Sequence, residues 1–342
     1  MGKIVTFGEI MLRLSPYGNL RFCQDEGLFK ATFGGAEANV AVSLANFGEE
    51  VDFVTKLPDN PIANGAISVL RSFGVDVSKI VRGGARIGIY FLEKGASQRG
   101  SVCVYDRYGS SLQEAEISDF DWDSVFAGAE WFHFTGITPA LSKNLYEICK
   151  SACKSAKKLG VKISCDLNYR SKLWTRKDAQ EAMTELCRYV DVCMLNEEDA
   201  MSIFGIKADN TDIYSGKINS KGYCSVARQL KNLFGFEYVA VTLRTSYSAS
   251  VNDWAAMLYD GSECYFSKSY RIEPIIDRVG AGDSFGAGLI FALKNGYECQ
   301  NAVEFAVAAS ALKHSIEGDF NRVSVAEVER LAGGDGSGRV QR

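Results

Sequence analysis

The 342-residue chain is predicted to form one α/β domain, a three-layer, doubly wound fold with a mostly parallel sheet and a small β-sheet lid. The first observation behind this prediction is that short β-rich segments alternate with longer helical segments, as they do in βαβ units. The second is that helices of this length cover both faces of such a sheet. The third is that two segments break the alternation, and these are predicted to form the lid.

Strand and helix candidates follow one another along most of the chain. The strand candidates are residues 4–7, 51–56, 131–134, 161–166, 190–195 and 238–243. The helix candidates are residues 36–47, 61–73, 143–159, 178–189, 225–234, 281–294 and 301–314. Ligands bind at the carboxyl ends of the strands in such sheets, so the functional site is expected there.

The lid is predicted from residues 11–33 and 86–113, which read as short antiparallel strands rich in Tyr, Phe, Gly and charged residues. Residues 205–222 are polar and are predicted to form a surface excursion. Residues 333–342 are Gly-rich and polar, which is typical of a disordered tail. The folded domain is therefore expected to span residues 1–332.

Composition and charge restrict the class of protein. With 46% hydrophobic residues the chain can bury one large core. A formal net charge of -4 argues against nucleic acid as a general partner. No apolar run approaches the length of a membrane span, and the chain begins directly with a strand, so neither a membrane segment nor a secretory signal is expected. We therefore expect a cytoplasmic protein.

The ten cysteines are scattered and include no Cys-x-x-Cys pair. Several of them, such as Cys149, Cys153 and Cys165, lie in apolar periodic segments, and this favours buried reduced thiols over disulfides or zinc. Only two histidines are present, so a His-based metal site is not expected. A metal ion would more plausibly be Mg²⁺ held by oxygens and phosphates.

The segment from Asp277 to Gly288, with the sequence DRVGAGDSFGAG, carries the strongest chemical signal. Gly280, Ala281 and Gly282 have almost no side chain, so their backbone N–H groups can approach an anion at the start of the predicted helix. Asp283 lies at the same place, where a carboxylate is suited to accept a proton from a hydroxyl nucleophile. The alternative is an ordinary Gly-rich helix start with an acidic residue in its first turn.

A second glycine-rich block, GGAEANVA, runs from Gly34 to Ala41. Gly34 and Gly35 precede a predicted helix, and one interpretation is that they form a turn and have no further role. However, Asn39 is a polar residue on an otherwise apolar helical face, and a buried amide needs partners.

These two blocks resemble the C-terminal and N-terminal signatures of the ribokinase-like (PfkB) carbohydrate kinases, and the resemblance covers nearly all of residues 3–331. The resemblance implies phosphoryl transfer from ATP, with Asp283 as the base beside an anion hole. It further implies that Gly34, Gly35 and Asn39 contact sugar hydroxyls. The resemblance leaves open whether a monovalent cation binds, because Asp277 occupies a position that is linked to such a cation in the family.

The sugar site is predicted from two further groups of residues. Tyr90, Tyr105 and Arg107 in the lid face either the sugar or solvent. Asp166, Asn168 and Arg170 follow a strand, where Asp and Asn can also be turn formers. The string CDLNYRSKLW from residue 165 to 174 is similar to the version in the 2-keto-3-deoxygluconate branch of the family. Arg107 and Arg170 are the candidates for binding a substrate carboxylate, since the guanidinium fork suits that group.

The nucleotide and metal site is predicted from the next strand ends. The family uses Asn-x-x-Glu to organise Mg²⁺ and its waters, whereas this chain has Asn196 followed by Glu197, Glu198 and the shorter Asp199. On this resemblance Glu197 and Asp199 are expected to hold Mg²⁺ through water. The alternative for this group is a helix start with acidic residues. The remaining nucleotide candidates are Thr242, Arg244 and Val307, with Arg278 held as either a branch feature or an ordinary loop cation.

The sequence thus predicts an ATP-dependent kinase that converts 2-keto-3-deoxygluconate to 2-keto-3-deoxy-6-phosphogluconate. The alternatives are a neutral-sugar kinase such as a fructokinase or ribokinase, a nucleoside kinase, and a non-catalytic sugar or nucleotide sensor. A homodimer or higher homo-oligomer is also expected, because lids in this family often carry dimer contacts and an exposed β-lid with Phe and Tyr is a poor free edge in solution.

Overall fold

The computed structural model describes residues 2–24, 27–196, 198–207 and 220–339. Glu197 and most of the predicted surface excursion lie outside this part of the chain. The central sheet has nine strands, in the order β14-β13-β12-β11-β10-β9-β1-β4, with β15 paired to β13. Its parallel strands are β1 (Lys3–Phe7), β4 (Val51–Val54), β9 (Ala129–Thr135), β10 (Lys162–Asp166), β11 (Val192–Asn196) and β12 (Tyr238–Ser246). The antiparallel strands are β13 (Asn252–Tyr259), β14 (Cys264–Phe266) and β15 (Tyr270–Ile272).

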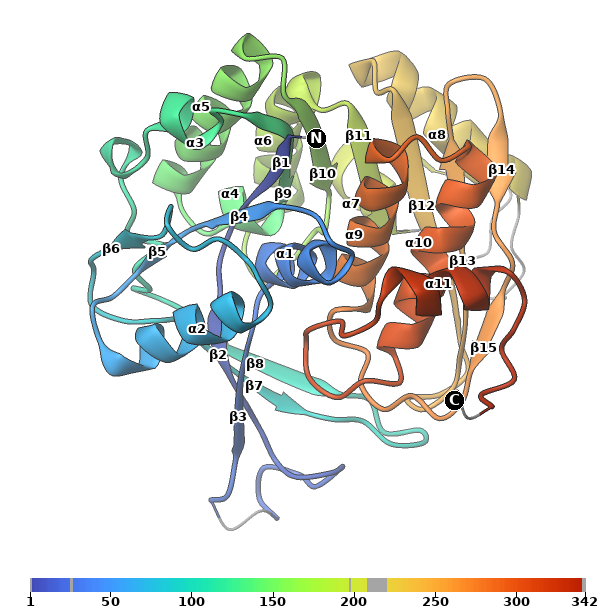
Figure 1. The fold of residues 1–342 in the computed structure, drawn as a ribbon, viewed down its shortest axis with the longest axis horizontal. Coiled ribbons are helices and arrows are strands. Elements are labelled where there is room, and N and C mark those ends of the chain that lie inside the picture. The colour runs from blue at the N-terminus through green and yellow to red at the C-terminus, as the bar shows by residue number, and fades with distance from the viewer. Residues whose placement is uncertain (1, 25–26, 197, 208–219, 340–342) are drawn as a thin grey trace.

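Helices cover both faces of this sheet (Figure 1). One large apolar cluster joins the sheet to α3 (Trp122–Val125), α5 (Lys143–Lys158), α6 (Arg176–Leu186), α7 (Asp199–Phe204) and α8 (Ser220–Phe234). The other joins it to α1 (Ala36–Asn46), α2 (Pro61–Ser72), α9 (Ala281–Lys294), α10 (Cys299–Lys313) and α11 (Val325–Ala332). Neighbouring strand residues such as Phe132 and Trp131 belong to different clusters, because successive side chains point to opposite faces. The three-layer fold is therefore confirmed.

The lid is a separate four-stranded sheet that projects from the body (Figure 1). Its order is β3-β2-β7-β8, with β2 (Met11–Ser15), β3 (Lys30–Gly34), β7 (Ile89–Glu93) and β8 (Val102–Asp106). Each hairpin is antiparallel, as predicted, but β2 and β7 pair in parallel. The prediction of an entirely antiparallel lid is therefore wrong at the strand pair that joins its two halves.

The remaining elements are short. They are β5 (Lys56–Leu57), β6 (Val81–Arg82) and α4 (Ile137–Ala140), with 3₁₀ turns at Ile117–Asp119 and Cys187–Tyr189. Residues 335–339 of the predicted tail are exposed and irregular. Within the described ranges, no helix combines the length and the apolarity needed to cross a membrane.

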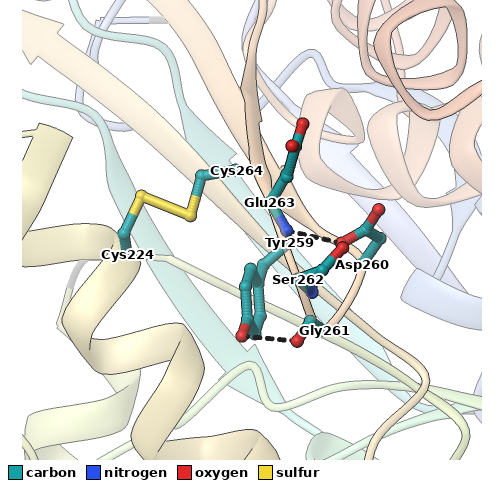
Figure 2. Close-up of a disulfide and its surroundings, with 7 residues drawn as sticks. All are labelled: Cys224, Tyr259, Asp260, Gly261, Ser262, Glu263 and Cys264. Carbon is teal, nitrogen blue, oxygen red and sulfur yellow. Dashed lines mark hydrogen bonds between the residues drawn. A yellow bond between two sulfur atoms is a disulfide. The ribbon is translucent and has the colours of Figure 1, made fainter.

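The cysteines correct one prediction. Cys149, Cys153 and Cys165 are buried free thiols, as expected. Cys224 on α8 and Cys264 on β14 form a disulfide beside the turn between β13 and β14 (Figure 2). The preference for reduced thiols is therefore wrong for this pair, whose partners lie 40 residues apart in the sequence and meet only because α8 packs on that edge of the sheet.

Candidate active site

A pocket of about 430 Å³ lies where the lid meets the carboxyl ends of the parallel strands and the start of α9. Most of the residues predicted from the sequence line it together. They are Gly35, Asn39, Tyr90, Tyr105, Arg107, Asp166, Asn168, Arg170, Asn196, Thr242, Arg244, Gly280, Ala281, Gly282 and Asp283. Three predicted residues do not line it, namely Gly34, Asp199 and Val307.

One residue of the glycine-rich loop at the start of α9 has a backbone conformation that favours glycine. Gly280 is the N-cap of α9 and has a φ of 83°, in the left-handed region. A Cβ there would also lie 2.1 Å from the carbonyl oxygen of Asp319. Gly282 is exposed and would meet no atom within 4 Å, so its backbone stays open to a ligand. The loop thus presents N–H groups at the positive end of a 14-residue helix, which is suited to a phosphate.

Asp283 lies half-buried in the first turn of α9. Burial raises the pKa of its carboxyl to about 6, and a hydrogen bond from Asn39 opposes this rise. Asn39 Nδ2 donates to Asp283 Oδ2 over 2.6 Å, while Asn39 Oδ1 accepts from Gly35 N at 3.2 Å. The two signature blocks, separated by 244 positions, therefore meet through this amide, and the carboxylate is held at the pocket with a pKa suited to a general base.

A buried charge network supports the glycine loop from behind. Arg13 on β2 donates through Nη1 to Asp319 Oδ1 at 2.7 Å and through Nη2 to Asp277 Oδ2 at 2.6 Å. The hydroxyl of Tyr90 on β7 donates to the carboxylate of Asp319 at 2.6 Å. A Cβ at Gly34 would lie 2.1 Å from Asp319 Oδ2, so Gly34 makes room for this carboxylate beside the pocket. The network fastens two lid strands to the loop that carries the anion site.

Arg107 has an unusual environment for a guanidinium. It is only 9% exposed, and its Nε and Nη1 atoms have no hydrogen-bond partner. The guanidinium carbon lies 4.1 Å from the centre of the Tyr105 ring, and Glu9 Oε2 lies 3.4 Å from Nη1. Burial raises the pKa of Glu9, although Arg107 and a hydrogen bond from Ser110 oppose it. Unpaired buried donors are costly, so these atoms are suited to a ligand acceptor.

Carboxylates crowd the strand ends on the other side of the pocket. Burial, together with the charges of Asp199 and Asp283, raises the pKa of Asp166 well above its usual value. Asp199 is buried, and its two oxygens accept hydrogen bonds from the backbone N–H groups of Tyr169 and Asn196, each at 3.1 Å. Asp199 therefore organises the turn between β11 and α7. Asn168 tolerates a φ of 41° beside it, as asparagine does more readily than most residues.

The side-chain oxygen atoms at these strand ends fit Mg²⁺ only together with the phosphates of a nucleotide. No group of three or more His, Cys, Asp or Glu side chains within the described ranges could hold a metal ion alone. Asp166 and Asn196 nevertheless face the pocket, and a cation there would relieve the repulsion among the carboxylates. Oxygen ligands of this kind suit an ion that keeps several waters and binds substrate phosphates. The predicted ligand Glu197 lies outside the described residues.

Two arginines that follow later in the chain add positive charge to the pocket wall. Arg244 on β12 and Arg278 in the loop before α9 both line it, and burial together with Arg244 lowers the pKa of Arg278. Thr242 lies on the same strand as Arg244. Val307, predicted to lie near the nucleotide base, is instead fully buried in the core on α10 and has no surface at the pocket.

The sequence prediction missed several residues of the site. They are Glu9, Arg13, Asn252, Trp254 and Asp319. Asp319 lies in the segment between α10 and α11, for which the sequence predicts no site residue. Arg13 gives no local signal, because its partners lie 264 and 306 positions away.

Comparisons with known proteins show the family to which the chain is similar. A family model described as "pfkB family carbohydrate kinase" matches residues 1–321. The 2-dehydro-3-deoxygalactonokinase of Haloferax volcanii is 33% identical over 334 residues, which cover 97% of this chain and 98% of that protein.

Solved structures are similar over nearly the whole chain. The crystal structure of 2-dehydro-3-deoxygluconokinase from Thermotoga maritima is 50% identical, with a TM-score of 0.94 and coverage of 98% of this chain and 100% of that one. A putative 2-keto-3-deoxygluconate kinase from Enterococcus faecalis is 25% identical, with a TM-score of 0.91 and coverage of 100% and 99%. The likeness thus extends to the lid as well as the sheet.

Proposed function

The chain belongs to the pfkB family of carbohydrate kinases, and from this premise we propose that it phosphorylates the terminal hydroxyl of a 2-keto-3-deoxy sugar acid with ATP. The proposed reaction converts 2-keto-3-deoxygluconate to 2-keto-3-deoxy-6-phosphogluconate. The relatives support this substrate class, since their names include a 2-dehydro-3-deoxygluconokinase and a 2-dehydro-3-deoxygalactonokinase.

The observation that carries the acid-sugar assignment is the state of Arg107. A nearly buried guanidinium lines the same pocket as Asp283, and two of its nitrogen atoms have no hydrogen-bond partner although one of them forms an ion pair with Glu9. A substrate carboxylate would supply the missing acceptors, and charge-assisted hydrogen bonds of this kind are among the strong ones. Arg170, which is exposed in the loop after β10 and lines the same pocket, is the second proposed contact.

In the proposed mechanism, Asp283 accepts the proton of the terminal hydroxyl as its oxygen attacks the γ-phosphorus in line. Backbone N–H groups of Gly280, Ala281 and Gly282 stabilise the charge of the transferred group. Arg244, Arg278 and Thr242 hold the remaining phosphates, and Asn196 and Asp166, which line the same pocket, would hold Mg²⁺ and its waters. Mg²⁺, when bound with the nucleotide, neutralises phosphate charge. The lid excludes water that would otherwise hydrolyse ATP.

Two other functions fit less well. A neutral-sugar kinase does not need a buried guanidinium that has open hydrogen-bond donors at the pocket. A non-catalytic sensor would be expected to lose the base or the glycines, and this chain keeps Asp283, Gly280 and Gly282 in one pocket.

The deciding experiment is a coupled ADP-release assay with Mg-ATP and a panel of five sugars: 2-keto-3-deoxygluconate, 2-keto-3-deoxygalactonate, gluconate, fructose and ribose. Turnover concentrated on the two keto-deoxy acids is expected. Turnover on fructose or ribose instead would refute the assignment of Arg107 and keep that of Asp283. No ADP release with any of the five sugars would favour the non-catalytic sensor.

The proposal also has a cellular and an oligomeric part. We place the reaction in the cytoplasm, where ATP is available. We further propose a homodimer formed through the lid, because β8 is an edge strand with apolar residues on its surface.

A further inference from the structure

Lys313 is a buried titratable residue that the mechanism above does not use. It is the last residue of α10 and is 0% exposed. Its Nζ lies 3.0 Å from the carbonyl oxygen of Ile316 and 3.5 Å from that of Asp277. An ammonium seldom lies fully buried without a compensating charge, so its surroundings need an explanation.

Those surroundings are the charge network behind the anion loop. Lys313 and Arg13 together face two buried carboxylates, those of Asp277 and Asp319. Burial lowers the pKa of Lys313 to about 8, and the two carboxylates oppose this, so the ammonium form persists at neutral pH. With both cations present the network is balanced, and without Lys313 it carries an excess negative charge.

The position of this excess charge matters for the reaction. The carbonyl oxygen of Asp319 packs directly against Gly280, and the side chain of Asp277 caps the backbone N–H of Val279 at 3.1 Å. Both contacts hold the loop whose N–H groups face the pocket. An unbalanced carboxylate behind this loop would weaken its attraction for phosphate, because charge interactions are strong in a buried environment.

The same contacts leave no site for a metal cation at Asp277. Its Oδ2 accepts from Arg13 at 2.6 Å and from the N–H of Gly318 at 3.2 Å, and its carbonyl oxygen faces Lys313. A monovalent metal ion would need these oxygens. The residues present therefore do not fit the monovalent cation that the family resemblance left open.

We infer that Lys313 is a tethered cation: its ammonium, together with the Arg13 guanidinium, does internally what a bound monovalent ion would do, which is to join the anion loop to the loop after α10. Lys313 is thus a positioning residue, since it acts on the reacting groups only through the loop. The inference rests on the proposed kinase function, and it predicts catalysis that is independent of monovalent cations.

The first test uses the wild-type enzyme. Its activity is measured in a tetramethylammonium salt and after replacement by K⁺, Na⁺ or NH₄⁺ at constant ionic strength. We expect kcat to change by less than about twofold, because general screening is held constant. Strong activation by K⁺ or NH₄⁺ would overturn the inference.

The second test is Lys313→Ala, which removes the ammonium and opens space for a small cation. We expect kcat to fall by roughly tenfold, equivalent to about 1.4 kcal/mol, and to recover in part with NH₄⁺ or propylammonium. The melting temperature of the variant should also rise with these ions, because a ligand that binds the folded state stabilises it. A folded variant with no response in either readout contradicts the proposal.

The matched control is Lys294→Ala. Lys294 is also nearly buried, with 4% of its side chain exposed, and it pairs with Glu49 at the far end of α9. Lys294, Glu49 and Glu130 do not line the pocket, so the loss of Lys294 should lower stability while kcat stays independent of added cations. If the wild type turns over no sugar acid, the proposed function fails, whereas the melting experiment on Lys313→Ala still decides the present inference. If Lys313→Ala does not fold, the wild-type experiment decides it.

Discussion

A carboxylate beside an anion site must be positioned by specific contacts, and Asp283 has such a contact in Asn39. The amide spans two elements, since its oxygen accepts from Gly35 while its nitrogen donates to the base. From the sequence, Asn39 is predicted to be a buried amide in need of partners and, through the family resemblance, a sugar contact. Its hydrogen bond to Asp283 is not predicted, because Asp283 lies on a distant helix. Three residue-scale predictions follow from this pocket.

Asp283→Asn removes the proton acceptor and keeps the side-chain shape. We expect kcat to fall by roughly 10³-fold, the range of a lost general base, with little change in melting temperature. Steady-state kinetics with 2-keto-3-deoxygluconate measures this. Asp123→Asn, on the exposed surface of α3, is the control and should keep full activity. Near-normal turnover in Asp283→Asn would show that the base is assigned wrongly.

The pH profile should report the same group. Because burial raises the pKa of Asp283 to about 6, and the base acts in its charged form, kcat/KM should decline as the pH falls through this value. In Asn39→Ala the hydrogen bond that favours the carboxylate is lost, so the acidic limb should move to higher pH by about one unit. Asn46→Ala, on the same helix, should keep the wild-type profile. If the acidic limb of Asn39→Ala stays at the wild-type pH, the limb does not report the titration of Asp283.

Arg107→Ala tests recognition of the acid. We expect KM for 2-keto-3-deoxygluconate to rise by about 10- to 100-fold, as for a lost charge-assisted hydrogen bond. If the enzyme also turns over fructose, the KM for fructose should be the same in the variant as in the wild type. Arg86→Ala is the matched control, since Arg86 lies in the lid but pairs with Asp106 outside the pocket. An equal rise for acid and neutral sugars would remove the carboxylate role of Arg107.

At the scale of elements, the helix predicted for residues 281–294 agrees with α9, and most parallel strands begin and end near their predicted positions. These elements carry local signals, namely glycines at a cap and apolar periodicity. The strands β13, β14 and β15 were missed, because they form an antiparallel edge without intervening helices. The parallel pairing of β2 with β7 was also out of reach, since it depends on which distant strands meet.

Gly280→Ala tests the entry into α9. The change forces a left-handed residue to carry a Cβ against the carbonyl of Asp319, so we expect a lower melting temperature and a kcat loss of about 100-fold from the displaced loop. Thermal unfolding and kinetics measure the two effects. Gly282→Ala meets no atom within 4 Å and should keep the wild-type melting temperature. Equal melting temperatures for both variants would contradict the strain argument.

At the scale of the whole molecule, the lid exposes apolar side chains that would face water in a monomer. Its edge strand β8 exposes Val102 and Val104 by 45% and 48%, and Tyr108 in the turn after it is 86% exposed. An apolar edge of this kind is prone to pair with another chain.

Sedimentation velocity at micromolar concentration should therefore show a dimer. Val104→Lys should weaken it, because a charge on the edge strand opposes pairing. Leu233→Lys changes a similarly exposed apolar residue, 58% exposed on α8, and should leave the dimer intact. A wild-type protein that sediments only as a monomer would exclude the proposed assembly.

The ion pair between Arg13 and Asp319 also has a consequence for synthesis. Its partners are 306 positions apart, so the ribosome makes Arg13 long before Asp319. Arg13 also pairs with Asp277, which comes 264 positions after it, so the lid base can contact the anion loop before Asp319 is made. A chain truncated before Asp319 is expected to keep only the pair with Asp277, and its lid should be held less firmly than when both pairs are present.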